Sequence, residues 1–259
     1  MSTKSLLGRH WFETLFSIQN KRLKRRRCGG EHYRLPKLET APKPVPVIET
    51  LTLVSLVAAV LALCLFAWIA QSVSHPPASN FDLSVRARIH QYASPRMVGV
   101  MIAASFLGEG GLTIACVCAF VAFAKLRWRR AVLWLVTAIL GALLLNFTLK
   151  YAFHRPRPAP FFWPPHQTYD SFPSGHALFS FCVYGVIAGL LCGRIRSLRV
   201  RFSIWAFAAL LVAAIGLSRI YLGMHYPSDV IAGYLAGTIW VCALVVLDRM
   251  RIRQKVALR

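Results

Sequence analysis

The chain has 259 residues, of which 56% are hydrophobic and only 15% are charged, and its formal net charge is +22. Soluble domains carry about 25% charged residues, so this composition, with apolar residues in long uncharged runs, excludes an ordinary soluble domain and indicates membrane helices. The basic residues stand in short clusters between the apolar runs, which favours anchoring in a membrane over binding of nucleic acid.

The beginning of the chain is polar and basic, contains prolines and lacks the apolar core of a signal peptide. We predict that residues 1–47 form a cytoplasmic tail that touches anionic lipid headgroups. Residues 48–248 are predicted to form an all-α bundle of six membrane helices, in which small residues such as Gly141 and Gly233 allow close packing. Residues 249–259 are predicted to form a second basic tail. The expected spans are approximately 50–72, 97–124, 131–151, 175–193, 202–220 and 228–247.

Basic clusters alternate with the spans along the chain. Beyond the N-terminal tail, the clusters are Lys125/Arg127/Arg129/Arg130, Arg194/Arg196/Arg199/Arg201 and Arg249/Arg251/Arg253/Lys255. In a chain with six spans, these clusters and both termini fall on one side of the membrane, which the positive-inside rule makes the cytoplasm. We therefore predict a multi-pass protein of the cell (inner) membrane, with the loops at 152–174 and 221–227 on the periplasmic or outer face.

The outward-facing segments contain fixed positive charge. Lys150 lies at the end of the third span, Arg157 follows that span, and Arg219 ends the fifth. Arginine carries a planar fork that suits phosphate oxygens. Ser174 and Gly175 open the fourth span, and the free N–H groups at the start of a helix favour an anion. These features together indicate a site for phosphate.

Two histidines and one carboxylate complete this set. Asp229 lies four residues after His225, which is one helical turn, so it can hold the imidazole by accepting its N–H. An oriented, neutral imidazole is a competent nucleophile, and His176 can protonate a leaving oxygen. Cations stabilise charge on the phosphoryl oxygens, so the combination suits phosphoryl transfer.

The order Lys-x6-Arg-Pro, Pro-Ser-Gly-His and Ser-Arg-x5-His-x3-Asp, within residues 150–229, resembles the type 2 phosphatidic acid phosphatase (PAP2) superfamily. The resemblance implies a haloperoxidase-like helical fold and an enzyme that hydrolyses lipid phosphates without a metal or other cofactor. It implies that His225 is a nucleophile that forms a phosphohistidine, that Asp229 orients it, and that His176 is the general acid. The residues implied to bind phosphate are Lys150, Arg157, Ser174, Gly175 and Arg219.

Three features have more than one interpretation. Arg155 belongs to a second Arg-Pro pair inside the first motif, although the family spacing selects Arg157. Glu109, a charge in the outer part of an apolar span, is either a functional residue or a helix-start residue beside a glycine bend. The aromatic loop within 161–170 is either an interfacial belt or a lid over the lipid.

The leading hypothesis is a lipid phosphate phosphatase at the outer leaflet. The alternatives are a vanadate-dependent halide oxidase, against which the six spans argue, and a non-catalytic lipid carrier, against which the intact His176, His225 and Asp229 argue. Polyprenyl (undecaprenyl) diphosphate is favoured over phosphatidic acid, phosphatidylglycerol phosphate and lipid A phosphates, because an outward site suits recycling of such a carrier. The expected partners are the lipid phosphate and the bilayer, with no nucleic acid; the sequence does not determine the oligomeric state.

Overall fold

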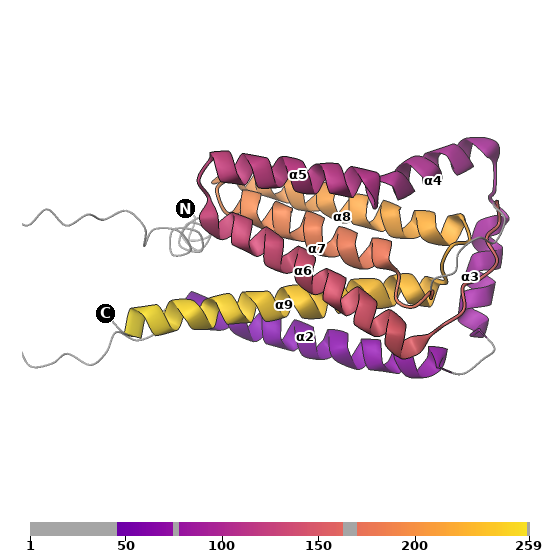
Figure 1. The fold of residues 1–259 in the computed structure, drawn as a ribbon, viewed down its shortest axis with the longest axis horizontal. Coiled ribbons are helices and arrows are strands. Elements are labelled where there is room, and N and C mark those ends of the chain that lie inside the picture. The colour runs from indigo at the N-terminus through magenta and orange to yellow at the C-terminus, as the bar shows by residue number, and fades with distance from the viewer. Residues whose placement is uncertain (1–45, 75–77, 163–169, 258–259) are drawn as a thin grey trace, which may run out of the picture.

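The computed structural model describes residues 46–74, 78–162 and 170–257, and these residues form eight α-helices and no strand (Figure 1). The helices are α2 (Pro46–Val73), α3 (Asn80–His90), α4 (Pro95–Leu107), α5 (Gly110–Lys125), α6 (Arg129–Phe153), α7 (Gly175–Cys192), α8 (Leu198–Tyr221) and α9 (Pro227–Ala257). Six stretches of the described chain are long and apolar enough to cross a membrane, with α4 and α5 counted together as one. The predicted all-α fold with six spans is confirmed, while residues 1–45 of the predicted N-terminal tail lie outside the described residues.

The long helices run side by side, and α3 lies across one end of the bundle (Figure 1). α2 packs along α9, and α7 contacts α5, α6, α8 and α9, which places it in the centre. The start of α2 and the end of α9 lie at the end opposite α3, together with the α5–α6 and α7–α8 connections. An ion pair between Arg130 and Asp248 joins α6 to α9 there. The predicted basic clusters therefore lie at one end and the motif-bearing loops at the other, whereas the side that faces the cytoplasm stays a prediction.

The apolar core surrounds the central helix. α7 contributes Leu178, which is fully buried, to a core shared with α2, α6 and α9. A Cβ atom on Gly141 would lie 2.0 Å from the Trp240 ring, and one on Gly233 would lie 2.7 Å from the backbone oxygen of Ser174. No side chain fits at such distances, so the prediction that small residues allow close helix packing is confirmed.

The second span is bent rather than continuous. α4 and α5 are separated at Gly108 and Glu109, where the backbone of Glu109 has φ −131° and ψ −88°, outside the helical region. A Cβ atom on Gly108 would lie 2.6 Å from Ile215 Cγ2 and 2.9 Å from His176 Cδ2. The break thus lets the backbone pass close to His176. The span predicted over 97–124 is confirmed as one stretch, Pro95–Lys125, and its helix is interrupted at the glycine bend expected beside Glu109.

Two further elements differ from the prediction. The segment between the first two expected spans, residues 73–96, contains a helix, α3. Its N-cap Ser79 accepts a hydrogen bond from the Asp82 N–H at 3.2 Å. α3 is short and polar, so a search for apolar spans does not find it. α9 continues to Ala257 through most of the predicted tail at 249–259, because lysine and arginine favour helix formation.

Candidate active site

Backbone hydrogen bonds bring the motif segments together at the α3 end of the bundle. The His225 N–H donates to the Arg219 carbonyl at 3.2 Å, which folds the turn after α8 back onto that helix. The Ser174 N–H donates to the Asp229 carbonyl at 2.9 Å, so the start of α7 meets the start of α9. Residues that lie more than forty positions apart in the sequence therefore share one site.

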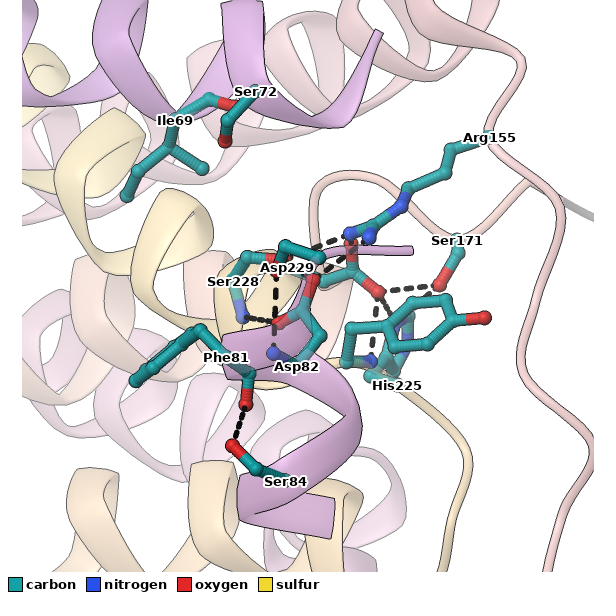
Figure 2. Close-up of polar contacts among 12 residues, drawn as sticks. Ile69, Ser72, Phe81, Asp82, Ser84, Arg155, Ser171, His225, Ser228 and Asp229 are labelled. Carbon is teal, nitrogen blue, oxygen red and sulfur yellow. Dashed lines mark hydrogen bonds and ion pairs between the residues drawn. The ribbon is translucent and has the colours of Figure 1, made fainter. Parts of the chain in front are cut away.

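His225 lies in the turn between α8 and α9 and is only 2% exposed. Its Nδ1 lies 3.5 Å from Asp229 Oδ2. The Ser171 hydroxyl lies between them, 3.3 Å from Nδ1, and donates to Asp229 Oδ2 at 2.5 Å (Figure 2). Because the Ser171 proton is directed to the carboxylate, its oxygen can accept the N–H of His225 Nδ1. That tautomer leaves Nε2 with the lone pair that a nucleophile needs.

His225 and Asp229 are neighbours as expected, but a turn rather than a helix places them together. α9 begins only at Pro227, a residue favoured at the first helical position because it has no N–H to satisfy. His225 is therefore outside the helix, and Asp229 Oδ2 accepts the Tyr226 N–H at 2.9 Å. His225 and Asp229 are thus not separated by one helical turn as predicted, because the carboxylate reaches back over the start of α9.

Arg155 and Arg157 face different groups. Arg155 is 6% exposed; its Nη1 donates to Asp229 Oδ1 at 2.6 Å and its Nη2 to Asp82 Oδ2 at 2.8 Å (Figure 2). Burial opposes its charge, but the two carboxylates outweigh burial and raise the pKa of Arg155. Arg157 acts electrostatically on His225, and burial lowers the pKa of Arg157. Arg157 is thus placed to meet an anion beside His225, whereas Arg155 is engaged by carboxylates.

His176, the second residue of α7, lies among cations. The cations that act electrostatically on its ring are Arg219, Arg157 and Lys150, and the His225 ring also lies nearby. The Arg219 side chain is held by a hydrogen bond from Nη1 to Ser105 Oγ at 2.5 Å. Lys150 Nζ donates to the backbone oxygen of Asp170. A concentration of positive charge of this kind favours an anion between its members.

Several buried polar atoms around the start of α7 have no hydrogen-bond partner in the part of the chain that the structure describes. Among them are the donors Ser174 Oγ, His176 Nε2 and Arg219 Nε and the acceptor Asn146 Oδ1. Buried polar groups are normally paired, and an unpaired one costs about 1–3 kcal/mol. α7 also begins here, with free N–H groups at its start. A Cβ atom on Gly175 would lie 3.0 Å from Asn146 Oδ1, so glycine suits this tight position. Phosphate oxygens can pair with all of these donors.

Glu109 lies beside the same histidine. Its Oε2 is 3.6 Å from His176 Nε2, and its side chain is 80% exposed. Glu109 also directly precedes α5, although its side chain makes no capping hydrogen bond. It therefore occupies a helix start and borders the site, so the two interpretations from the sequence do not exclude each other.

Three residues of the site were not predicted from the sequence. Asp82 contacts Arg155, Ser105 contacts Arg219 and Ser171 contacts His225. None of the three belongs to a motif. The pattern of a serine followed three residues later by an acid, at positions 79 and 82, is typical of a helix start and signals α3. No local pattern signals the partners of these residues, because the partners come from distant segments.

The first residues of the aromatic loop pack against the protein. Phe161 stacks on the His90 ring with centroids 4.0 Å apart, and Phe162 stacks on Tyr221 at 6.1 Å. The rest of the loop, at 163–169, lies outside the described residues, so the choice between belt and lid stays open.

The donors of the site suit an anion. They are cationic side chains, a hydroxyl and backbone N–H groups, which are hydrogen-bond donors rather than metal ligands. Among the described residues, no group of three or more His, Cys, Asp or Glu could hold a metal ion.

The bundle and its site define the chain as a multi-pass membrane protein with a cation-lined histidine site at one end. The PAP2 superfamily model matches residues 131–253 of the chain. This match confirms the resemblance drawn from the three motifs. It covers α6 to α9 and leaves out α2 to α5.

Individual relatives are similar over somewhat less than half of the chain. Phosphatidylglycerophosphatase B of Bacillus subtilis is 36% identical over 117 residues, 43% of this chain and 56% of the relative. Undecaprenyl-diphosphatase of Sulfolobus acidocaldarius is 34% identical over 125 residues, 46% of this chain and 56% of the relative. The chain thus spans about half the length of these curated relatives.

The fold is similar to a solved membrane protein. The crystal structure of a transmembrane PAP2 type phosphatidylglycerolphosphate phosphatase from Bacillus subtilis matches with a TM-score of 0.66 and 27% sequence identity. The match covers 75% of this chain and 96% of that chain. It therefore supports the arrangement of the spans as well as the motif-bearing half.

Proposed function

We propose that this protein is an integral membrane lipid phosphate phosphatase that works through a phosphohistidine on His225. The observation that carries the proposal is the meeting of an oriented imidazole, a second histidine and unpaired donors at the start of α7. The names of the relatives, which are phosphatases of lipid phosphates, support the same class of activity.

In the first half of the proposed reaction, His225 Nε2 attacks phosphorus in line with the leaving oxygen. The P–N bond forms as the P–O bond to the lipid breaks, and His176 gives its proton to the leaving oxygen. Lys150, Arg157 and Arg219 stabilise the charge on the other phosphoryl oxygens. The negative phosphate offsets these cations, which allows the His176 ring to carry its proton until the transfer.

In the second half, His176 is neutral and takes a proton from water, whose oxygen attacks phosphorus. The P–N bond breaks, inorganic phosphate leaves, and His225 returns to its neutral form. The ring of His225 is positive while it is bonded to phosphorus. The buried negative charge of Asp229 stabilises that form, because its carboxylate lies 3.5 Å from His225 Nδ1 and accepts a hydrogen bond from Ser171.

For orientation and substrate, we propose that the site faces the periplasm or the outside, with both termini in the cytoplasm, according to the positive-inside rule. A site at the membrane surface keeps phosphate hydrated while lipid tails stay in the bilayer. An outward site suits a polyprenyl diphosphate, and the relative named undecaprenyl-diphosphatase supports this choice. Phosphatidylglycerol phosphate, phosphatidic acid and lipid A phosphates are the substrates to compare with it.

Purified protein should release phosphate from lipid phosphates in the presence of EDTA and should be inhibited by vanadate, which mimics a five-coordinate phosphoryl group. The measurement is phosphate release in detergent across the four lipid classes named above, with the His225→Ala protein purified in parallel as the blank. Inhibition by EDTA that a divalent ion reverses would contradict the metal-free mechanism. Lack of release from every lipid would favour a carrier of phosphate-bearing lipids.

The pH dependence should reflect the burial of His225. Burial disfavours the charged ring and lowers the pKa of His225 to about 4, although Asp229 opposes this shift. A lowered pKa means that the ring stays neutral, and able to attack, down to about pH 5. We expect kcat/KM, corrected for titration of the substrate phosphate measured by phosphorus NMR, to have its acid limb well below pH 6. An acid limb near pH 6.5 that the substrate does not explain would contradict this assignment.

A further inference from the structure

Asp82 in α3 connects a helix outside the PAP2 match to the proposed nucleophile. It is fully buried (0% exposed) at the site end of the bundle. Its Oδ2 accepts from Arg155 Nη2 at 2.8 Å and from Ser228 Oγ at 2.7 Å, and its Oδ1 accepts from the Ser228 N–H at 2.9 Å (Figure 2). Both partners also adjoin Asp229, since Arg155 Nη1 donates to Asp229 Oδ1 at 2.6 Å.

The charges along this chain of contacts alternate. Arg155 lies between the carboxylates of Asp82 and Asp229, and Asp229 is joined to His225 through Ser171. The negative charge of Asp82 offsets part of the positive potential that Arg155 produces at Asp229 and His225. Without Asp82, that positive potential would be uncompensated and the net negative potential at the His225 ring would be smaller.

We propose that Asp82 is a positioning residue that acts through Arg155 on Asp229 and so on the nucleophilic His225. The proposal rests on the function proposed above for His225. Asp82 touches neither the histidines nor the cations that face the phosphate, so its effect belongs to the chemical step rather than to binding.

A different residue attaches α3 to the loops of the site. Arg86, one helical turn after Asp82, donates from Nη2 to the Ala159 carbonyl at 2.8 Å. Its guanidinium also lies over the Phe161 ring at 4.7 Å and over the Tyr226 ring at 5.3 Å. α3 thus has an anchor independent of Asp82, and a variant at Asp82 that keeps the side-chain volume should fold.

The test is Asp82→Asn, which keeps the shape and an acceptor for Ser228 but removes the charge facing Arg155. We expect kcat to fall about 10- to 100-fold, the effect of one charged hydrogen bond, with KM changed less than about 3-fold. Asp248→Asn is the matched control, because it also removes a carboxylate paired with an arginine, Arg130, but at the opposite end of the bundle. That control should keep the wild-type kcat.

A double-mutant cycle asks whether the effect passes through Arg155. When Arg155→Gln is already present, adding Asp82→Asn should lower kcat by less than about 3-fold, because the Arg155 charge that Asp82 offsets is absent. Arg155→Gln alone takes the cation from two buried carboxylates, Asp82 and Asp229, and the double variant removes one of these two charges. Independent, multiplicative losses would overturn the proposal, as would wild-type kcat in Asp82→Asn or a loss confined to KM.

A readout without turnover separates this proposal from the proposed function. The ¹⁵N NMR signals of the His225 ring, assigned by their absence in His225→Ala, report its tautomer in detergent-solubilised protein. We expect them to shift in Asp82→Asn and to stay in place in Asp248→Asn. If the protein releases no phosphate from any lipid but the His225 signals shift, the proposed function fails and the positioning role stands. Unchanged signals in Asp82→Asn overturn the positioning role in either case.

Discussion

His225→Ala should abolish phosphate release, with kcat lower by about 10⁴-fold or more, because the variant lacks the atom that bonds to phosphorus. The protein should stay folded, at a cost of about 1–3 kcal/mol for the lost buried ring. Asp229 would keep its hydrogen bonds from Arg155, Ser171 and the Tyr226 backbone. No buried charge is therefore left without a partner.

The measurement is phosphate release together with acid-quench trapping of ³²P-labelled protein from a labelled lipid phosphate. Wild type should carry label in an acid-labile, base-stable form typical of phosphohistidine, and His225→Ala should carry none. Thermal unfolding in detergent and the elution volume of the purified protein provide the folding control. Turnover within about tenfold of wild type would mean that another group is the nucleophile.

Asp229→Asn should lower kcat by about 10³- to 10⁴-fold, the size of effect seen when a buried aspartate that orients a histidine loses its charge. Asp229 is fully buried, and its Oδ1 accepts from Arg155 while its Oδ2 accepts from Ser171 and the Tyr226 N–H. An asparagine must direct its NH₂ group at one of these donors. The His225 ring would then lose both the carboxylate charge and the oriented Ser171 hydroxyl.

Stability should fall in the same variant, because breaking a buried ion pair costs about 3–5 kcal/mol. The measurement combines kcat and KM from phosphate release with thermal unfolding in detergent, each compared with Asp248→Asn. KM should change little, since Asp229 faces Arg155 and His225 rather than the cations that bind phosphate. A kcat within tenfold of wild type, in protein that remains folded, would show that Asp229 does not act on the nucleophile.

The membrane spans could be predicted from the sequence more fully than the bends and short helices that surround the site. Apolar runs of sufficient length predict spans directly, because a bilayer leaves the backbone no partners other than its own. The sequence indicated a glycine bend beside Glu109, but not the neighbours of Gly108, because Ile215 and His176 come from other helices. α3 was missed because it does not cross the membrane and so lacks an apolar signal.

By itself the sequence determined the membrane class, the number of spans and the residues assembled around His225 and His176, because composition and motif spacing are properties of the chain alone. Only the tertiary structure decided that Arg155 faces Asp82 and Asp229 while Arg157 faces the histidines. The two arginines are two residues apart in an irregular loop after α6, so no helical or strand period determines their directions. The places of Ser171 and Asp82 in the site were likewise decided by the tertiary structure, because their partners are distant in sequence. Burial of the Asp229 charge requires polar partners, and these come from other segments of the chain.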